Sequence, residues 1–287
     1  MANILAKQEN YNYWRDQKLA NANTKIEDCL VDIEQPNQLS SAEKKQIQHL
    51  CQRNNFALFN IAPTDNYPQT IANINAQFGL KQYDEHLYVK DHGLAHITQS
   101  NKKKQSEFIP YTDKAIGWHT DGYYNAPEHR IRSFSLFCVT PAETGGESQW
   151  LDQQMAYLLL REDNPDVAKA LTHPQAMTIP AHMLDGVTRR KISVGPVFFI
   201  DEPTSQLYMR YTQRKKNIEF LDSTEIKQAI AILDDLLNTQ SDYHFIHTMD
   251  ANQGMLCNNA LHKRSTFTDN VQQPRLLLRG RYFNRIN

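Results

Sequence analysis

The sequence lacks the features that mark secreted, disulfide-bonded chains and membrane-spanning chains. Its four cysteines are far apart and form no Cys-x-x-Cys pair. No stretch approaches the roughly 18 apolar residues that a membrane span needs, and the first ten residues contain no extended apolar segment. We therefore expect reduced, buried thiols, a cytoplasmic location and no membrane partner.

The sequence also lacks an excess of charge of either sign. It contains 31 basic and 32 acidic side chains, which gives a net charge of −1 and a pI near 6.8. Such a balance offers no general attraction for nucleic acid, so a small-molecule partner is expected. The 287 residues can bury one sizeable core and show no internal repeat or interdomain linker, which indicates a single domain.

A short His-x-Asp motif is the first candidate for chemistry. His119 and Asp121 are two positions apart, beside an aromatic segment and just before Gly122. In an extended strand, side chains at i and i+2 point to the same face and can reach one metal ion. Two imidazoles and one carboxylate can hold non-haem Fe(II) on one face, and His262 offers the second imidazole. Taken alone, a His-x-Asp triplet is weak evidence, since such residues are more often surface or hydrogen-bonded groups.

Arginines gather near the C-terminus. Arg275 lies thirteen positions after His262 and, in a strand, would share one face with Arg279 and Arg281. Taken singly, each arginine is expected to be exposed. If that face lines an interior, each guanidinium needs an anion, because an unpaired buried charge is costly.

Four ordered motifs together resemble the taurine dioxygenase-like family of Fe(II)/2-oxoglutarate-dependent oxygenases, which also includes γ-butyrobetaine hydroxylase and clavaminate synthase. The resemblance covers roughly 160 residues in the C-terminal half to two-thirds of the chain. The matching segments are Trp118-His119-Thr120-Asp121, Thr144-Gly145-Gly146-Glu147-Ser148-Gln149-Trp150, Asn258-Asn259-Ala260-Leu261-His262-Lys263-Arg264 and Arg275-Leu276-Leu277-Leu278-Arg279.

The resemblance implies a role for each matching residue. His119, Asp121 and His262 would hold Fe(II), while Ser148 and Arg275 would bind the distal carboxylate of 2-oxoglutarate. O2 would be the second co-substrate, with succinate and CO2 as products. The intact Asp121 favours hydroxylation over halogenation, because related halogenases replace this carboxylate with a small residue.

The substrate pocket is less well specified by the sequence. By resemblance, Arg279 would meet an anionic group of the prime substrate. Tyr123, Tyr124 and Arg210 are candidates for the pocket lining, although packing roles are at least as expected for each alone. The segment 99–111 contains a polar run that we interpret as a surface loop or as a lid over the site.

Two other interpretations of the motifs stay open at this point. A zinc-dependent hydrolase could use the same three ligands, but it would leave Arg275 unexplained. A non-catalytic jelly-roll protein could keep the pocket as a small-molecule sensor. O2-dependent formation of succinate from 2-oxoglutarate separates the three, and a homo-oligomer is compatible with each.

We expect an α+β fold with a double-stranded β-helix (jelly-roll) core and flanking helices. One oxygenase domain would span 1–287, with an α/β N-terminal part over about 1–110 and the jelly-roll core with the metal site over about 111–287. Alternation and capping residues predict the main elements. Helices are expected at 10–19, 40–53, 68–78, 153–161, 163–171 and from 223, and strands at 29–33, 56–61, 133–140, 176–179, 197–200, 207–211, 244–249, 254–261 and 274–283.

Overall fold

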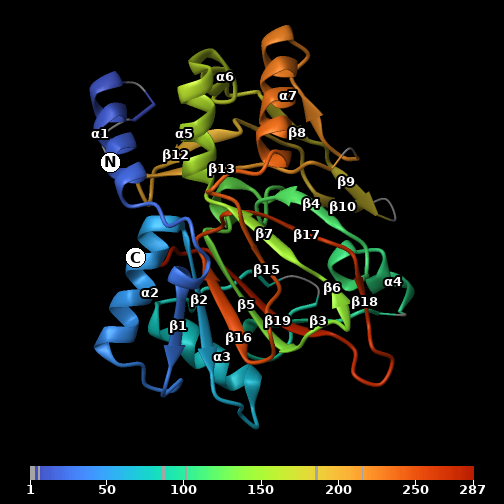
Figure 1. The fold of residues 1–287 in the computed structure, drawn as a ribbon. Coiled ribbons are helices and arrows are strands. Elements are labelled where there is room, and N and C mark those ends of the chain that lie inside the picture. Colours follow the sequence, from blue (N-terminus) through green and yellow to red (C-terminus); the bar gives the residue numbers. More distant parts are fainter. Residues whose placement is uncertain (1–3, 6, 86–87, 101, 185–186, 215) are drawn as a thin grey trace.

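The structure is a computed structural model that describes all residues except 1–3, 6, 86–87, 101, 185–186 and 215. It is a mixed α/β arrangement in which, over the described residues, seven α-helices accompany nineteen strands in six mostly antiparallel sheets (Figure 1). None of the helices described is long and apolar enough to cross a membrane.

The largest sheet contains strands from both ends of the chain. Its order is β1-β2-β16-β5-β19-β3, and only the β1–β2 pair is parallel. The N-terminal strands therefore extend the same sheet as the C-terminal strand. Its members are β1 (Leu30–Ile33), β2 (Phe56–Ile61), β16 (Gln253–Cys257), β5 (Ser133–Thr140), β19 (Leu276–Tyr282) and β3 (Ala95–Ile97).

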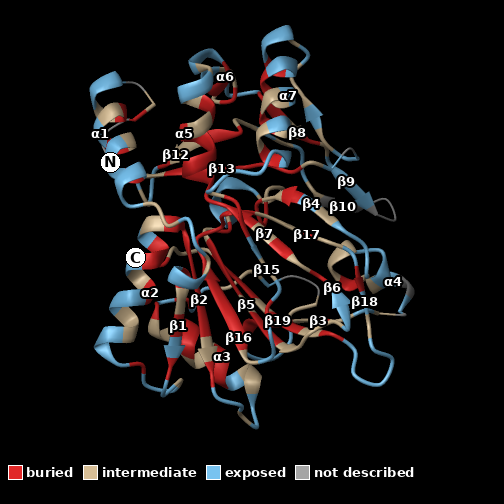
Figure 2. Cartoon of the chain, in the orientation of Figure 1, coloured by how far each residue is buried: buried red, intermediate tan, exposed pale blue. Residues whose placement is uncertain are grey.

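Apolar side chains on both faces of this sheet explain its position inside the molecule. Phe59 and Phe137 pack on the outer face beneath α2 (Ser41–Asn54) and α3 (Tyr67–Gln77). Phe56 and Phe134 point to the opposite face and belong to an inner core. Figure 2 shows the buried strands between the exposed surfaces of the helices. The capping box predicted at the start of α2 is confirmed, since Ser40 and Glu43 exchange side-chain-to-backbone hydrogen bonds.

A second sheet carries the predicted metal ligands. Its order is β15-β7-β17-β4, with β15 (Phe245–His247), β7 (Ser148–Leu151), β17 (Leu261–Arg264) and β4 (Ile116–His119). The sequence-based prediction of one strand over 254–261 is wrong. The chain leaves the large sheet after Cys257, turns through Asn259 at φ 54°, and enters the second sheet at Leu261. Asparagine tolerates this left-handed conformation better than most residues, and it allows the change of sheet.

A helical layer covers the remaining side of the second sheet. The amphipathic helix predicted from Ser223 is confirmed as α7 (Thr224–Asn238), with Ile226, Leu233 and Leu237 buried. It packs in one core with the other helices of this layer, α1 (Gln8–Ala20), α5 (Gln153–Asp163) and α6 (Pro165–Ala170).

The remaining elements are short. They comprise α4 (Lys103–Ser106), β6 (Thr144–Gly145), β8 (Met177–Ile179), β9 (His182–Leu184), β10 (Val187–Arg190), β11 (Ser193–Gly195), β12 (Phe198–Asp201), β13 (Gln206–Met209), β14 (Glu219–Phe220) and β18 (Phe267–Thr268).

Candidate metal centre and its arginines

Strand pairing brings the two motif histidines together. His262 on β17 lies directly opposite His119 on β4, and their ring centroids are 4.1 Å apart. Asp121 lies two residues beyond the end of β4. One ligand atom from each of the three side chains lies within 4.8 Å of the others, so this group could hold a metal ion. No other such group occurs among the residues that the structure describes.

Both imidazoles are oriented by a hydrogen bond at the same ring nitrogen, Nδ1, which leaves the other nitrogen available for a metal. The Nδ1 of His119 is 2.9 Å from the Gly117 carbonyl, and the Nδ1 of His262 is 3.0 Å from the Ala260 carbonyl. A proton on Nδ1 that donates to each carbonyl leaves Nε2 with a free lone pair. Burial, with the neighbouring imidazole, lowers the pKa of His119 to about 3, and burial also lowers the pKa of His262. Both rings are therefore neutral at pH 7, as a metal ligand requires.

Asp121 is held through its backbone while its carboxylate stays available. The Asn259 side chain accepts a hydrogen bond from the Asp121 N–H at 2.7 Å and donates to the Asp121 carbonyl at 3.0 Å. Asp121 Oδ2 is buried and has no hydrogen-bond partner in the described part of the chain. Burial favours a higher pKa for Asp121, but the positive charge of Arg279 and further neighbouring groups outweigh it and lower the pKa. An ionised carboxylate whose oxygen accepts no hydrogen bond is suited to bind a metal cation.

A segment after β13 fixes β4 and the predicted metal ligands from the side opposite β17. Tyr211 accepts a hydrogen bond from the Thr120 N–H at 3.0 Å, and Gln213 donates its N–H to the Trp118 carbonyl at 2.8 Å. Asp234 on α7 in turn accepts bonds from the Tyr211 hydroxyl and, at 3.1 Å, from the Gln213 side chain. The sequence predicted a positioning role for none of these three residues, because their spacing carries no motif; Tyr211 was expected only as a candidate for the pocket lining.

Arg275 is a buried cation that forms no ion pair within the described part of the chain, although the charge of Asp269, which accepts a hydrogen bond from the Arg275 backbone N–H, acts on it. Arg275 is 5% exposed, and its guanidinium makes no hydrogen bond or ion pair with any described residue. The Phe267 ring lies 4.9 Å from it, and a side chain at Gly146 would come within 3.7 Å of its Nε. Burial lowers the pKa of Arg275. Ser148 is buried on β7, opposite Arg264 on β17.

The two following arginines of β19 are also inside the molecule, so the default expectation of exposure fails for them as well. Arg279 approaches Asp121 at 3.7 Å, and its Nε is buried without a partner in the described residues. Arg281 forms an ion pair with Asp84 and donates to the Tyr124 hydroxyl at 3.0 Å. Both arginines keep a buried Nε without a partner in the described chain, but Arg281 is hydrogen-bonded to its carboxylate, whereas Arg279 reaches only Asp121, at 3.7 Å.

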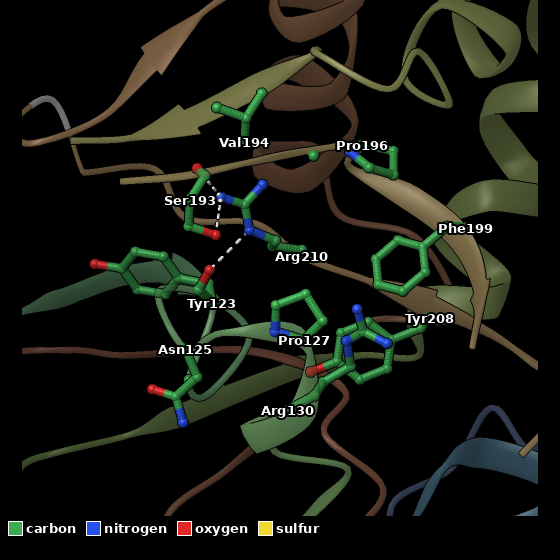
Figure 3. A pocket seen from close by; sticks show the side chains of 12 residues that line it. Tyr123, Asn125, Pro127, Arg130, Ser193, Val194, Pro196, Phe199, Tyr208 and Arg210 are labelled. Carbon is green, nitrogen blue, oxygen red and sulfur yellow. Dashed lines mark hydrogen bonds between the residues drawn. The ribbon is translucent and has the colours of Figure 1, made fainter. Parts of the chain in front are cut away.

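The other predicted pocket residues divide between two places. Tyr124 lies beside Arg281, but Tyr123 and Arg210 line a separate cavity (Figure 3). The Arg210 guanidinium donates to main-chain carbonyls, including those of Tyr123 at 2.9 Å and Ser193 at 2.8 Å. Their role in substrate binding stays a prediction.

The segment predicted as a surface loop or lid contains both exposed and buried parts. Within 99–111, the structure describes the helix α4 and a turn of 3-10 helix at Ile109–Tyr111, while Asn101 lies outside the described residues. Tyr111 is 2% exposed, and its hydroxyl has no partner in the described chain. The charges of Arg279 and Arg281 act on this hydroxyl, so the end of the segment lies close to the arginines.

Comparisons with known proteins agree with this geometry. The model of the family described as taurine catabolism dioxygenase TauD, TfdA matches residues 16–281. A uridine-5'-phosphate dioxygenase of a Streptomyces species is 29% identical over 225 residues, which cover 75% of this chain and 78% of that protein.

Solved structures show the same fold at low sequence identity. An asparagine oxygenase in complex with Fe(II), hydroxyasparagine and succinate has a TM-score of 0.60 at 13% identity, covering 88% of this chain and 93% of its own. A taurine dioxygenase from Burkholderia xenovorans has a TM-score of 0.58 at 18% identity, covering 88% of this chain and 87% of its own.

Proposed function

Because the chain belongs to the TauD, TfdA family of dioxygenases, we propose that His119, Asp121 and His262 bind its iron and that its prime substrate carries an anionic group. The protein is an Fe(II)- and 2-oxoglutarate-dependent dioxygenase. The family assignment therefore disfavours the hydrolase and sensor interpretations of the motifs. We also propose that the six-stranded and four-stranded sheets form the two halves of a jelly-roll core around the metal site.

The unpaired guanidinium of Arg275 is the observation that best supports the co-substrate site. A buried arginine without a counter-ion is costly, and a dicarboxylic co-substrate removes that cost. Its planar fork suits a carboxylate bidentately, and Ser148 can add a hydroxyl donor. We therefore assign the distal carboxylate of 2-oxoglutarate to these two residues.

The protein side chains bind and orient the metal and the co-substrate. Bound Fe(II) and 2-oxoglutarate supply the oxidative chemistry, which consumes O2 and yields succinate and CO2. The two histidines present Nε2 lone pairs from fixed ring orientations, and Asp121 supplies one negative charge. Arg275 orients the co-substrate, while the buried walls exclude water.

The substrate class follows from Arg279 together with the relatives. Arg279 lies next to Asp121, is partly accessible and keeps an unused donor. A phosphate or other anion on the substrate would meet it close to the metal. Since the Streptomyces relative is a uridine-5'-phosphate dioxygenase, we propose a nucleoside 5'-phosphate, with uridine 5'-phosphate as the first candidate. Hydroxylation as the outcome, the oligomeric state and the cytoplasmic location stay predictions.

A matched panel of substrates tests this proposal. The enzyme, loaded with Fe(II) and 2-oxoglutarate, is exposed to O2 with uridine 5'-phosphate, uridine, taurine or no addition, and succinate is measured. Uridine 5'-phosphate should stimulate succinate release at least tenfold more than uridine, because uridine lacks the charge that Arg279 recognises. In Arg279→Ala, KM for the nucleotide should rise strongly while KM for 2-oxoglutarate stays nearly unchanged.

Three results would contradict the proposal at different levels. Stimulation by taurine but not by nucleotides would reject the nucleotide and keep the dioxygenase. Full activity in Asp121→Ala, with unchanged Fe(II) affinity, would reject the assigned ligand set. Equal loss of affinity for substrate and 2-oxoglutarate in Arg279→Ala would instead make Arg279 a structural partner of Asp121.

A further inference from the structure

A cavity beside the metal motif contains none of the residues assigned above to iron or co-substrate. It has a volume of about 180 Å³ and begins at Gly122, directly after Asp121 (Figure 3). One wall is the loop that follows Gly122, and the other comes from β11, β12 and β13. The lining residues are Gly122, Tyr123, Asn125, Pro127, Arg130, Ser193, Val194, Gly195, Pro196, Phe199, Tyr208 and Arg210.

Arg210 places a buried positive charge at this cavity. It is 7% exposed and donates to the carbonyls of Tyr123, Met177 and Ser193 and, at 3.3 Å, to the Ser193 hydroxyl. No carboxylate lies within ion-pair distance of it in the described structure. Burial, with a contribution from the charge of Arg130, lowers the pKa of Arg210 to about 10. Carbonyl dipoles satisfy most of its donors but do not neutralise its charge.

The neighbouring charges leave the cavity with a positive excess. Arg130 and Arg132 both contact Asp201, at 2.6 Å and 2.8 Å respectively. Asp201 is 1% exposed and is the one carboxylate that these two guanidiniums share. Of these three arginines only Arg130 and Arg210 line the cavity, and Asp201 pairs with Arg130 and Arg132, so the charge of Arg210 is the one that an anion in the cavity would offset.

Gly195 leaves an opening toward the buried guanidinium. A Cβ atom at this position would lie 3.3 Å from Arg210 Nη1, which is tighter than usual packing. Its φ is not in the left-handed region, so the backbone does not require glycine there. A glycine within a strand often marks a place where a ligand approaches closely. Nη1 donates to only one described acceptor, the Met177 carbonyl, so it keeps one N–H for a ligand.

The rest of the wall is flat and largely apolar. The Arg130 guanidinium lies over the Phe199 ring at 4.4 Å from its centroid and near the Tyr208 ring at 5.2 Å. Pro127 and Pro196 extend this surface (Figure 3). Such walls suit an aromatic ring. The volume is below the range of about 300–1,000 Å³ that drug-sized ligands occupy, so one ring with one acid group fits better than a larger molecule.

We propose that this cavity binds a small aromatic acid, whose carboxylate reaches Arg210 Nη1 past Gly195 and whose ring lies against Phe199 and the two prolines. This site is separate from the iron and co-substrate sites of the proposed function. The acid is either an independent ligand or the remote end of a substrate whose reacting part lies at the metal. Both sources present the same chemistry to Arg210.

A charge-matched pair of probes tests the site without turnover. The enzyme is loaded anaerobically with Fe(II) and saturating 2-oxoglutarate, so that Arg275 is occupied, and binding of 4-fluorobenzoate and neutral 4-fluorobenzamide is followed by fluorine NMR. The acid should bind at least fivefold more tightly than the amide. Gly195→Ala should weaken the acid at least fivefold, because the new methyl group covers Nη1.

A second variant controls for general electrostatics. Lys191→Gln removes an exposed positive charge just before β11 and should change binding less than twofold. Equal binding of acid and amide, or unchanged binding in Gly195→Ala, would overturn the proposal even if the enzyme proves to be a nucleotide dioxygenase. Displacement of the bound acid by uridine 5'-phosphate identifies the cavity as the remote end of the substrate site, whereas simultaneous binding identifies an independent ligand.

Discussion

The buried arginines of this protein differ in the hydrogen-bond and ion-pair partners of their guanidinium groups. The difference helps to identify the co-substrate site. Arg264 is buried and donates to the carbonyls of Thr112 and Lys114 at 2.8 Å and 2.6 Å. Arg281 has Asp84 as its counter-ion. Arg275 has neither kind of partner among the described residues, although it is as buried as Arg281. At the scale of single residues, this unfilled requirement supports a ligand-binding role for Arg275.

Replacing Arg275 should therefore affect the co-substrate selectively. Arg275→Ala should lose about 2–5 kcal/mol of binding if the pair with 2-oxoglutarate is desolvated, which corresponds to roughly 30-fold to several-thousand-fold weaker affinity. Arg275→Lys should also bind weakly, because a point charge cannot reproduce the fork. Calorimetric titration of the Fe(II)-loaded enzyme with 2-oxoglutarate under argon measures both.

The same titration has a control and a clear failure. Arg15→Ala, on α1 at the far side of the helical layer, removes an equal charge and should leave the affinity unchanged. Wild-type affinity in both Arg275 variants would place the carboxylate elsewhere, with Arg279 next to be tested.

At the scale of elements, the turn between β16 and β17 connects the large sheet to the second sheet, which carries the two proposed histidine ligands. The turn places His262 on the second sheet. Within the turn, the Asn259 side chain forms two hydrogen bonds with the backbone of Asp121. The same side chain donates to the Ile131 carbonyl at 2.7 Å and to the Tyr208 hydroxyl at 2.9 Å. Asn259 is 1% exposed. We therefore regard it as a positioning residue for the carboxylate ligand.

Substitution of Asn259 should weaken metal binding more than it weakens the fold. Asn259→Gly retains the φ of 54° without strain but removes the side chain that holds Asp121. Loss of an outer-shell partner typically costs about 10–100-fold in metal affinity, and we expect a loss in that range by Co(II) titration. Tyr208→Phe removes only the hydroxyl at the end of this network and should have a smaller effect. Metal affinity within twofold of wild type in Asn259→Gly, with normal folding, would show that β4 alone positions Asp121.

This turn also shows what the sequence could and could not predict. Alternation and capping residues located α2, α7, β2 and β5, because local periodicity determines those elements. The break at Asn259 was missed, since the apolar residues on either side of it read as one continuous strand. Its cause is tertiary: β17 must pair with β4 to bring His262 opposite His119. Likewise, the motifs predicted the three residues that the structure brings together, whereas Gln213 and Asp234 became visible only through long-range contacts.

At the scale of the whole molecule, a net charge near zero conceals an uneven distribution of charge. Buried arginines collect on β19 and around the cavity beside Gly122, while the charges near the metal site depend on the protonation of His119, His262 and Asp121. Metal occupancy and pH should therefore change the stability of the protein together.

The metal-free protein should lose stability as the pH falls below about 6.5. His119 and His262 have lowered pKa values in the folded state, so the unfolded chain takes up their protons first. The contribution of the two buried neutral imidazoles to the free energy of unfolding is therefore complete above the pKa of histidine in the unfolded chain. It declines as the pH falls toward about 3, the pKa of His119. Each histidine contributes a slope of at most about 1.4 kcal/mol per pH unit, and Asp121, whose pKa is also lowered, adds a further loss below about pH 4.

Thermal unfolding between pH 8 and pH 5, with and without Co(II), measures this coupling. Co(II) should raise the midpoint at pH 7.5, because it binds the folded state selectively. In the metal-free form, His262→Gln should reduce the slope between pH 6.5 and pH 5, because an amide does not titrate there, while exposed His129→Gln should leave it unchanged. A slope that is identical in wild type and His262→Gln would mean that this imidazole is not held neutral in the folded protein, and the proposed preparation of both rings for metal binding would then be wrong.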